Sequence, residues 1–122
     1  MLPYTLTFEQ LPDYLHARVS APEIDRETAL AYLREIADTR ASLGYDRFIL
    51  ERDIPQMLTD TDLFYTTNDF LLMMAGAKVA FLNPHLPIDA DMDFAIVIAA
   101  NRGAQFKLCK DLEEAEEWLS AD

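Results

Sequence analysis

The sequence has little of what a disulfide framework, a zinc site or a membrane span requires. Its 122 residues include one cysteine and two histidines. A single thiol cannot form an internal disulfide, and no Cys/His spacing suggests zinc. The longest apolar runs, such as residues 94–100, are far too short to cross a bilayer. The N-terminus has no basic stretch followed by an apolar run, so we expect no signal peptide and a cytoplasmic protein.

Basic residues are scarce relative to acidic ones. Ten lysines and arginines stand against 22 aspartates and glutamates, a formal net charge of −12. A field of this sign repels phosphate backbones and anionic lipid surfaces, so we expect no nucleic-acid partner and no membrane insertion. Hydrophobic residues make up 51% of the chain, which excludes disorder. The length fits one domain over residues 1–122.

Glycine is also rare, and its placement is informative. The three glycines, Gly44, Gly76 and Gly103, each follow a helical pattern. A left-handed cap at a helix end favours a residue without a Cβ. The glycines therefore predict the ends of three helices.

Hydrophobic periodicity supplies the remaining elements. Residues 4–9 and 14–19 alternate with period two and predict a hairpin of half-buried strands. The continuous triplet Phe48, Ile49 and Leu50 predicts a central strand covered on both faces. We expect the order β-β-α-β-α-β-α-β-α, an α/β fold with a mixed, mostly parallel sheet and an N-terminal antiparallel hairpin. The later strands are expected at 47–51, 78–82 and 104–109, and the helices at 25–43, 61–75, 89–102 and 111–120.

Ligands of open parallel sheets gather at the carboxyl ends of the strands. Here that edge holds the loop before Thr61 and residues 83–87, where two prolines are expected to exclude regular structure. Asn83 and His85 are therefore candidate ligand-edge residues. We expect Thr61 to lie near His85. His16 is expected on the outward, exposed face of an edge strand.

The cluster Asp60, Thr61 and Asp62 opens the second predicted helix. Two carboxylates there could bind a cation or act as acid and base, whereas simple N-capping explains the same residues. Asp89, Asp91 and Asp93 lack the glycine and glutamate of a calcium loop, so we interpret them as a cap and an exposed face. We expect no structural metal and no cofactor. No serine elbow, phosphate loop or Cys/His pair is present.

The second predicted helix carries more apolar residues than one buried face needs. Leu63, Thr67, Phe70, Leu71 and Met74 form its inner stripe, yet Tyr65, Leu72 and Met73 are also apolar. Such a surplus indicates deep core, a partner surface or an apolar ligand pocket. Val97 and Ile98 add to it on the third helix. We predict a homodimer that buries Tyr65, Leu72 and Met73.

Over nearly its full length the chain resembles the SpoIIAA-like branch of the STAS domains. The resemblance rests on the opening pair of alternating stretches, on Arg47-Phe48-Ile49-Leu50-Glu51, and on residues 99–103 and 111–119. It implies the fold of anti-sigma-factor antagonists, in which a serine after an aspartate opens the second helix and is phosphorylated. Asp60-Thr61 is the matching pair here. The branch is also similar to CRAL-TRIO lipid-binding domains, which implies an apolar ligand.

Three functions follow from these observations. The first is a non-catalytic cytoplasmic regulatory or protein-interaction module of STAS type, switched at the start of the second helix. The second is a binder or sensor of an apolar small molecule or lipid, which a deep apolar cavity would favour. The third is a hydrolase using Asp60, Asp62 and His85, which a carboxylate–histidine cluster around a pocket would favour.

Overall fold

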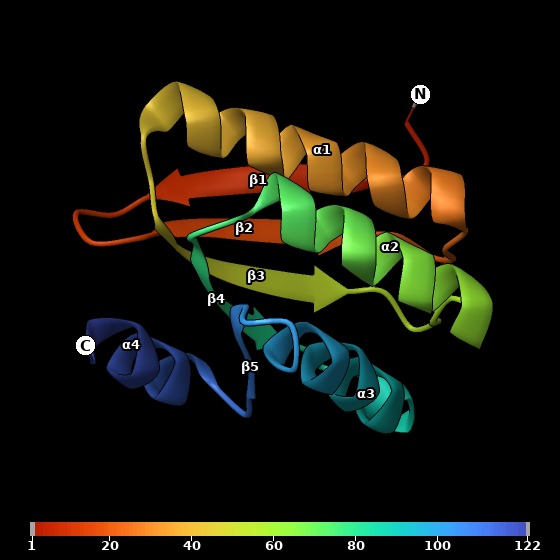
Figure 1. Cartoon of the computed structure of the whole chain (residues 1–122). Coiled ribbons are helices and arrows are strands. Elements are labelled where there is room, and N and C mark those ends of the chain that lie inside the picture. Colours follow the sequence, from red (N-terminus) through yellow and green to blue (C-terminus); the bar gives the residue numbers. More distant parts are fainter. Residues whose placement is uncertain (1, 122) are drawn as a thin grey trace.

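A computed structural model describes residues 2–121 of the chain. The order of its strands and helices is the predicted one, with a short 3-10 helix added (Figure 1). The elements are β1 (Thr5–Gln10), β2 (Leu15–Ser20), α1 (Arg26–Leu43), β3 (Arg47–Asp53), α2 (Asp60–Met73), β4 (Lys78–Leu82), η1 (Leu86–Ile88), α3 (Asp89–Ala100), β5 (Gln105–Cys109) and α4 (Leu112–Ser120).

The sheet contains five strands in the order β1-β2-β3-β4-β5. β1 and β2 pair antiparallel, and the other pairs are parallel. The predicted mixed sheet, with its hairpin at one edge and residues 47–51 at the centre, is confirmed. Each parallel crossover moves in the same direction along the sheet. Because such crossovers are right-handed, α1, α2 and α3 all pack on one face. α4 packs on the other face, against β4 and its neighbours.

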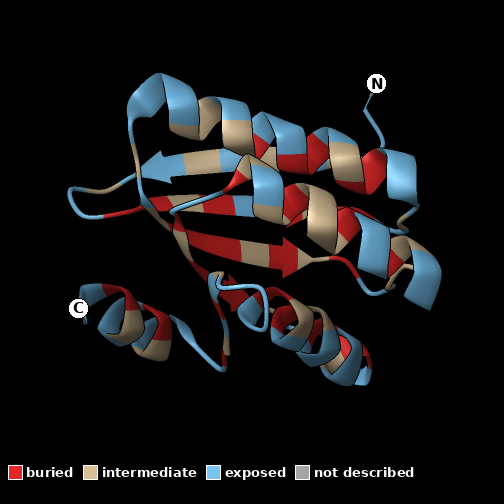
Figure 2. Cartoon of the chain, viewed as in Figure 1, coloured by how far each residue is buried: buried red, intermediate tan, exposed pale blue. Residues whose placement is uncertain are grey.

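The central strand is buried on both sides, as its apolar triplet predicts. Phe48, Ile49 and Leu50 are each at most 2% exposed, and Figure 2 shows β3 buried along most of its length. β3 continues two residues beyond the predicted end, through Arg52 and Asp53. Since side chains alternate along a strand, Arg52 faces the same side as Phe48 and Leu50.

The larger core lies between the sheet and α1–α3. The Asp25 carboxylate caps α1 by accepting a hydrogen bond from the Thr28 backbone N–H at 2.7 Å, and this bond lowers the pKa of Asp25. Gly44 ends the helix with a φ of +77°, as its position predicts. On α1 the buried face includes Tyr32, whereas Leu30 is only partly buried.

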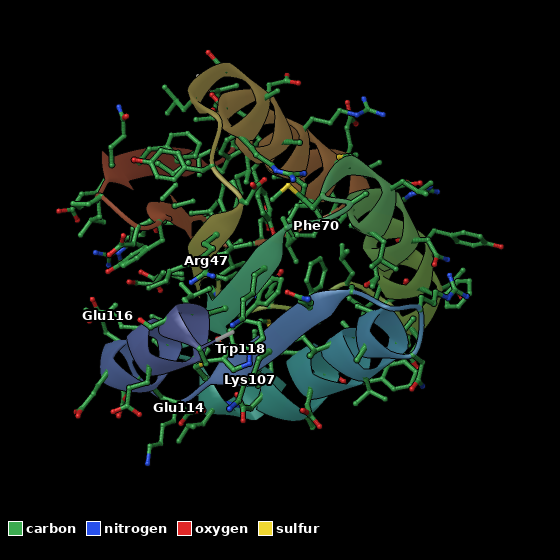
Figure 3. All side chains as sticks on the ribbon, turned by 60° about the vertical axis from the view of Figure 1, so that its left-hand side comes forward. Arg47, Phe70, Lys107, Glu114, Glu116 and Trp118 are labelled. Carbon is green, nitrogen blue, oxygen red and sulfur yellow. The ribbon has the colours of Figure 1, made fainter. Side chains whose placement is uncertain are left out.

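α4 is anchored by cations at its C-terminal end. The guanidinium of Arg47 and the ammonium of Lys78 donate to the main-chain carbonyls of Leu119 and Trp118. Figure 3 shows Arg47 beside this helix. Carbonyls in the last turn lack partners within the helix and carry the negative end of its dipole, so cations stabilise them.

Three local expectations are wrong. Residues 83–87 are not wholly irregular, because Leu86 and Pro87 begin η1, and proline is tolerated in a first helical turn. His16 is not on an edge strand, since β2 lies between β1 and β3, and its side chain is 17% exposed. Leu112, which the apolar pattern of residues 111–120 predicts to point inward, is 44% exposed at the start of α4.

Two smaller expectations also need correction. Cys109, which the alternation of residues 104–109 predicts to be a half-buried strand residue, is fully buried beneath α4, and burial raises the pKa of its thiol. Asp89 does not cap α3 with its side chain; Ile88 occupies the cap position. Among residues 2–121, no helix has the combined length and apolar character needed to cross a bilayer.

Candidate functional site

A cavity of about 80 Å³, partly open to solvent, lies between the sheet and helices α1, α2 and α3. Phe70 of α2 points into this space from the helix side (Figure 3). The lining is mostly aliphatic and aromatic: Ile24, Ala29, Tyr32, Leu33, Leu50, Arg52, Met57, Leu58, Leu63, Thr66, Thr67, Phe70, Phe81, Met92, Ala95, Ile96 and Phe106.

Local structure explains why these side chains converge. Leu63, Thr66 and Phe70 are spaced by three and four residues, so they share one face of α2. Leu50 and Arg52 are two residues apart on β3 and therefore share one face of the sheet. Three phenylalanines of the lining, Phe70, Phe81 and Phe106, contact one another. The ring centroids of Phe81 and Phe106 are 5.4 Å apart, and the Phe70 ring contacts both.

Arg52 is the one charged side chain in the described lining of this cavity. It is 5% exposed. Its guanidinium donates to the main-chain oxygen of Ile54 at 3.1 Å and to that of Gln56 at 2.7 Å. These bonds hold the segment between β3 and α2. Both acceptors are neutral carbonyls, so they satisfy two N–H groups without balancing the positive charge.

Thr66 is a second polar residue in the lining whose side chain is buried without a full set of partners. Its residue is 5% exposed, and its hydroxyl oxygen is buried with no hydrogen-bond partner among the described residues. A threonine in a helix usually bonds to the carbonyl one turn earlier or reaches solvent. A buried hydroxyl without a partner is unfavourable by about 1–3 kcal/mol. Thr66 therefore has capacity for a partner in the cavity.

Sequence reasoning missed Arg52 and Thr66, although signals for both were present. The alternation Phe48, Leu50, Arg52 continues the inward face of the central strand by one position. Thr66 lies three residues after Leu63 and four before Phe70, closer to the centre of the stripe than the expected Thr67. Thr67 is only partly buried, while Thr66 is fully buried.

The cluster predicted at the start of α2 lies outside the cavity. Thr59 is the cap, and its hydroxyl accepts from the Asp62 backbone N–H at 3.3 Å. Asp60 and Asp62 are in the first turn, and Thr61 is exposed there. Exposure leaves the Thr61 hydroxyl accessible. Its phosphorylation and its proximity to His85 remain predictions.

Asn83 and His85 form a turn after β4. The Asn83 side chain accepts from the His85 backbone N–H at 3.0 Å and donates to the His85 carbonyl at 2.9 Å. The His85 ring lies 2.8 Å from an Asp53 carboxylate oxygen. Within residues 2–121 no hydrogen bond or ion pair joins His85 to Asp60 or Asp62.

His85 and Asp53 belong to a row of charged groups that crosses β2 and β3 on the face away from α1–α3. His16 lies 3.2 Å from a Glu51 carboxylate oxygen. Arg18 lies 3.3 Å from Glu51 and 3.8 Å from Asp53. Carboxylates alternate along this row with imidazole and guanidinium groups. In the described part of the chain, no three His, Cys, Asp or Glu side chains are grouped so as to hold a metal ion.

The apolar surplus on α2 is divided between surface and core. Leu72 is 80% exposed and Tyr65 is 50% exposed, whereas Met73 packs partly against the main core. The Tyr65 ring lies 5.5 Å from the Arg26 guanidinium. On neighbouring α3, Val97 is 49% exposed. These exposed apolar side chains are candidates for contact with a partner.

Comparison with solved structures supports the resemblance noted in the sequence. The chain is similar to an uncharacterized protein of the DUF3478 family with a SpoIIAA-like fold, from Shewanella loihica PV-4. The sequences are 16% identical, the TM-score is 0.59, and the match covers 95% of this chain and 93% of that one. No family model and no curated protein sequence matches the chain. The chain therefore has a SpoIIAA-like fold.

Proposed function

We propose that this protein is a non-catalytic binding module of STAS type that takes a small apolar molecule between its sheet and helices α1–α3. The observation that carries the proposal is the cavity of about 80 Å³ lined mainly by aliphatic and aromatic side chains. Binding pockets are typically apolar with a few convergent polar groups. An apolar cavity was the feature expected to favour a small-molecule ligand over the other two functions.

The position of the cavity also supports ligand binding. Arg52 lies at the carboxyl end of the central parallel strand, and Met57 and Leu58 follow in the loop to α2. Ligands of open α/β sheets bind at this end of the strands. Methionine adapts readily to different shapes, so Met57 and Met92 suit a wall that repacks around a ligand.

Methyl NMR tests the proposal directly. Benzene is the neutral probe, and the methionine methyl groups are the reporters. We expect benzene to shift the Met57 and Met92 methyl signals and to leave Met73, which is outside the lining, unchanged. Ala95→Leu places a larger side chain in the cavity and should abolish the shifts. Ala100→Leu, at an exposed position of the same helix, should retain them.

Two outcomes contradict the proposal. One is an absence of saturable shifts at Met57 and Met92 with benzene, benzamide and benzoate alike. The other is equal binding by the Ala95→Leu and Ala100→Leu proteins, which would place the probe elsewhere.

A regulatory switch at Thr61 fits the same site. α2 carries exposed Thr61 in its first turn and Leu63, Thr66 and Phe70 along the cavity. A phosphate on Thr61 would be attracted by the helix N-terminus and repelled by Asp60 and Asp62. We expect Thr61→Glu to change the affinity for benzene about twofold to threefold, an effect of the size of helix-terminus electrostatics. Thr61→Val is the control, and equal affinities of the two variants would contradict the switch.

Self-association is the second candidate function, favoured by the exposure of Leu72, Tyr65 and Val97 on α2 and α3. A second copy of the chain would bury these side chains, and two-fold dimers are the commonest oligomers. Light scattering at high micromolar concentration should give twice the monomer mass of 13.9 kDa. Leu72→Glu should give the monomer with an unchanged circular dichroism spectrum. A wild-type mass equal to the monomer would contradict the dimer.

A cytoplasmic location is part of this proposal, and the single free thiol, Cys109, is compatible with it. Hydrolysis is less well supported by the geometry. His85 and Asp53 form a hydrogen-bonded pair, yet neither lines the cavity. Their row lies on the opposite side of the sheet from the apolar walls.

A further inference from the structure

We propose that the ligand of the cavity is a compact apolar carboxylate, with its carboxylate group against Arg52 and Thr66 and its hydrocarbon part among the phenylalanines. This inference rests on the proposed function and specifies its ligand class. Three independent features of the site carry it: the uncompensated charge of Arg52, the partnerless hydroxyl of Thr66 and the limited volume of the cavity.

The charge of Arg52 is the first feature. Seven ion pairs occur among the described residues, and Arg52 takes part in none of them. A guanidinium has five N–H donors, of which the carbonyls of Ile54 and Gln56 engage two groups. An arginine that is 5% exposed normally pairs with an anion, because burial of an isolated charge is very unfavourable. A planar carboxylate matches the guanidinium fork and supplies the missing charge.

The hydroxyl of Thr66 is the second feature. It is buried, has no partner among the described residues, and lines the same cavity as Arg52. A hydroxyl can donate one hydrogen bond to a carboxylate oxygen. Arg52 comes from the sheet and Thr66 from the helix layer, so a carboxylate would be contacted from both walls.

The volume and the walls define the rest of the ligand. A cavity of about 80 Å³ is smaller than the roughly 150 Å³ cavity that accommodates benzene in an engineered protein. The bound group is therefore no larger than one ring or a short branched chain, with the open side and Met57 giving some extra room. One guanidinium and one hydroxyl match a monoanion. A phosphate dianion would need more donors than the described lining offers.

Benzoate and benzamide are a matched pair of probes, because they share size and planarity and differ in charge. In methyl NMR titrations of the whole chain, we expect benzoate to bind at least about tenfold more tightly than benzamide, the effect of one charge-assisted hydrogen bond. Inorganic phosphate alone should produce no saturable shift at Met57 and Met92, because it lacks the apolar part.

Two variants test whether Arg52 and Thr66 bind the carboxylate. Arg52→Met keeps much of the side-chain length and removes the charge, so it should reduce benzoate affinity to that of benzamide. Because Arg52 also holds residues 54–56, a folded circular dichroism spectrum is the condition for using this variant. Thr66→Val leaves that segment untouched and removes only the hydroxyl. It should weaken benzoate about tenfold, the lower value for a hydrogen bond to a charged group, and leave benzene affinity unchanged.

The outcomes separate this inference from the proposed function. Equal affinities for benzoate and benzamide, with both binding in the cavity, would overturn the carboxylate and leave the apolar site standing. Unchanged benzoate binding in Thr66→Val would likewise overturn it, even if Arg52→Met does not fold. Binding of phosphate as tight as that of benzoate would show a simple anion site. Failure of benzene, benzamide and benzoate together would refute the proposed function itself.

Discussion

The two faces of the sheet treat charge in opposite ways. On the face away from α1–α3, five side chains form a connected row in which each contacts a group that can complement it: His16, Arg18, Glu51, Asp53 and His85. On the face covered by α1–α3, Arg52 is buried among apolar groups, and within residues 2–121 its guanidinium bonds to two neutral carbonyls and to no anion. The number of charged groups on a face is therefore a poor guide to a binding site. The uncompensated charge on the apolar face is the more informative feature.

The largest expected effect concerns the helix-covered face. Phe48 is 1% exposed in the larger core. Phe48→Ala should lower the free energy of unfolding by about 3–5 kcal/mol, because it removes apolar contacts and leaves a cavity. Urea denaturation measures this change. A loss below about 1 kcal/mol would mean that this face packs loosely.

The α4 side should respond less to an equivalent change. Leu119 is 2% exposed in the smaller cluster beneath α4. Leu119→Ala should cost about 2–3 kcal/mol, the lower part of the range for such substitutions, since the end of a short helix can collapse into the space. A larger loss of unfolding free energy for Leu119→Ala than for Phe48→Ala in urea denaturation would contradict this. It would mean that the smaller cluster contributes more to stability at these positions than the larger core.

Tyr14 offers a test on the α4 side that depends on pH. Burial, and then its 2.9 Å hydrogen bond to Glu116, raise the pKa of Tyr14 from 10.0 to about 12. The folded chain therefore keeps the phenolic proton more tightly than the unfolded chain. This stabilisation is complete below about pH 10 and is lost as the pH rises through about 12.

Tyr14→Phe should cost about 1 kcal/mol at neutral pH, the value of one hydrogen bond. Above pH 10, the ordinary pKa of tyrosine, the stability of the Tyr14→Phe protein should also fall less steeply than that of the wild type. Urea denaturation at several alkaline pH values checks this, with exposed Tyr65→Phe as the control. Parallel curves for wild type and Tyr14→Phe would contradict the prediction.

The smallest expected effect concerns the charged row. His85 and Asp53 are partly exposed, at 30% and 35% of their side chains. A double-mutant cycle with His85→Gln and Asp53→Asn should give a coupling of about 0.5 kcal/mol, typical of exposed pairs. Neither change should alter benzoate binding, because neither residue lines the cavity. A large loss of benzoate binding in either variant would show that the charged row and the cavity are coupled.

Much of the fold could be predicted from the sequence because its signals are local. The alternating hairpin strands, the triplet at residues 48–50, the Asp25 cap and Gly44 each depend on nearby residues, and the structure has them as expected. The sequential order of the strands could not be read in this way. Alternating strands and helices fit sheets with helices on both faces equally well, and only tertiary packing places α1–α3 together.

The site was harder to predict than the fold. Reactive groups near loops, such as those of Asp60, Thr61 and His85, are the candidates that a sequence offers. The cavity instead depends on residues that look ordinary in sequence: an arginine at the end of an apolar strand and a threonine inside a helix. Their importance lies in what they lack, a counter-charge and a hydrogen-bond partner. That shortage becomes apparent only when the surrounding elements are in place.

The sequential strand order has a consequence for how the chain folds during synthesis. Each strand pairs with the strand made immediately before it, so the sheet can grow one strand at a time behind the ribosome. β3, α1 and α2 supply one side of the cavity early, whereas Met92 of α3 and Phe106 of β5 come later in the chain. If the chain folds in this order, we expect Arg52 to stay accessible to water until those last walls arrive. Its charge would then be buried only at the end of assembly, when a ligand can be enclosed with it.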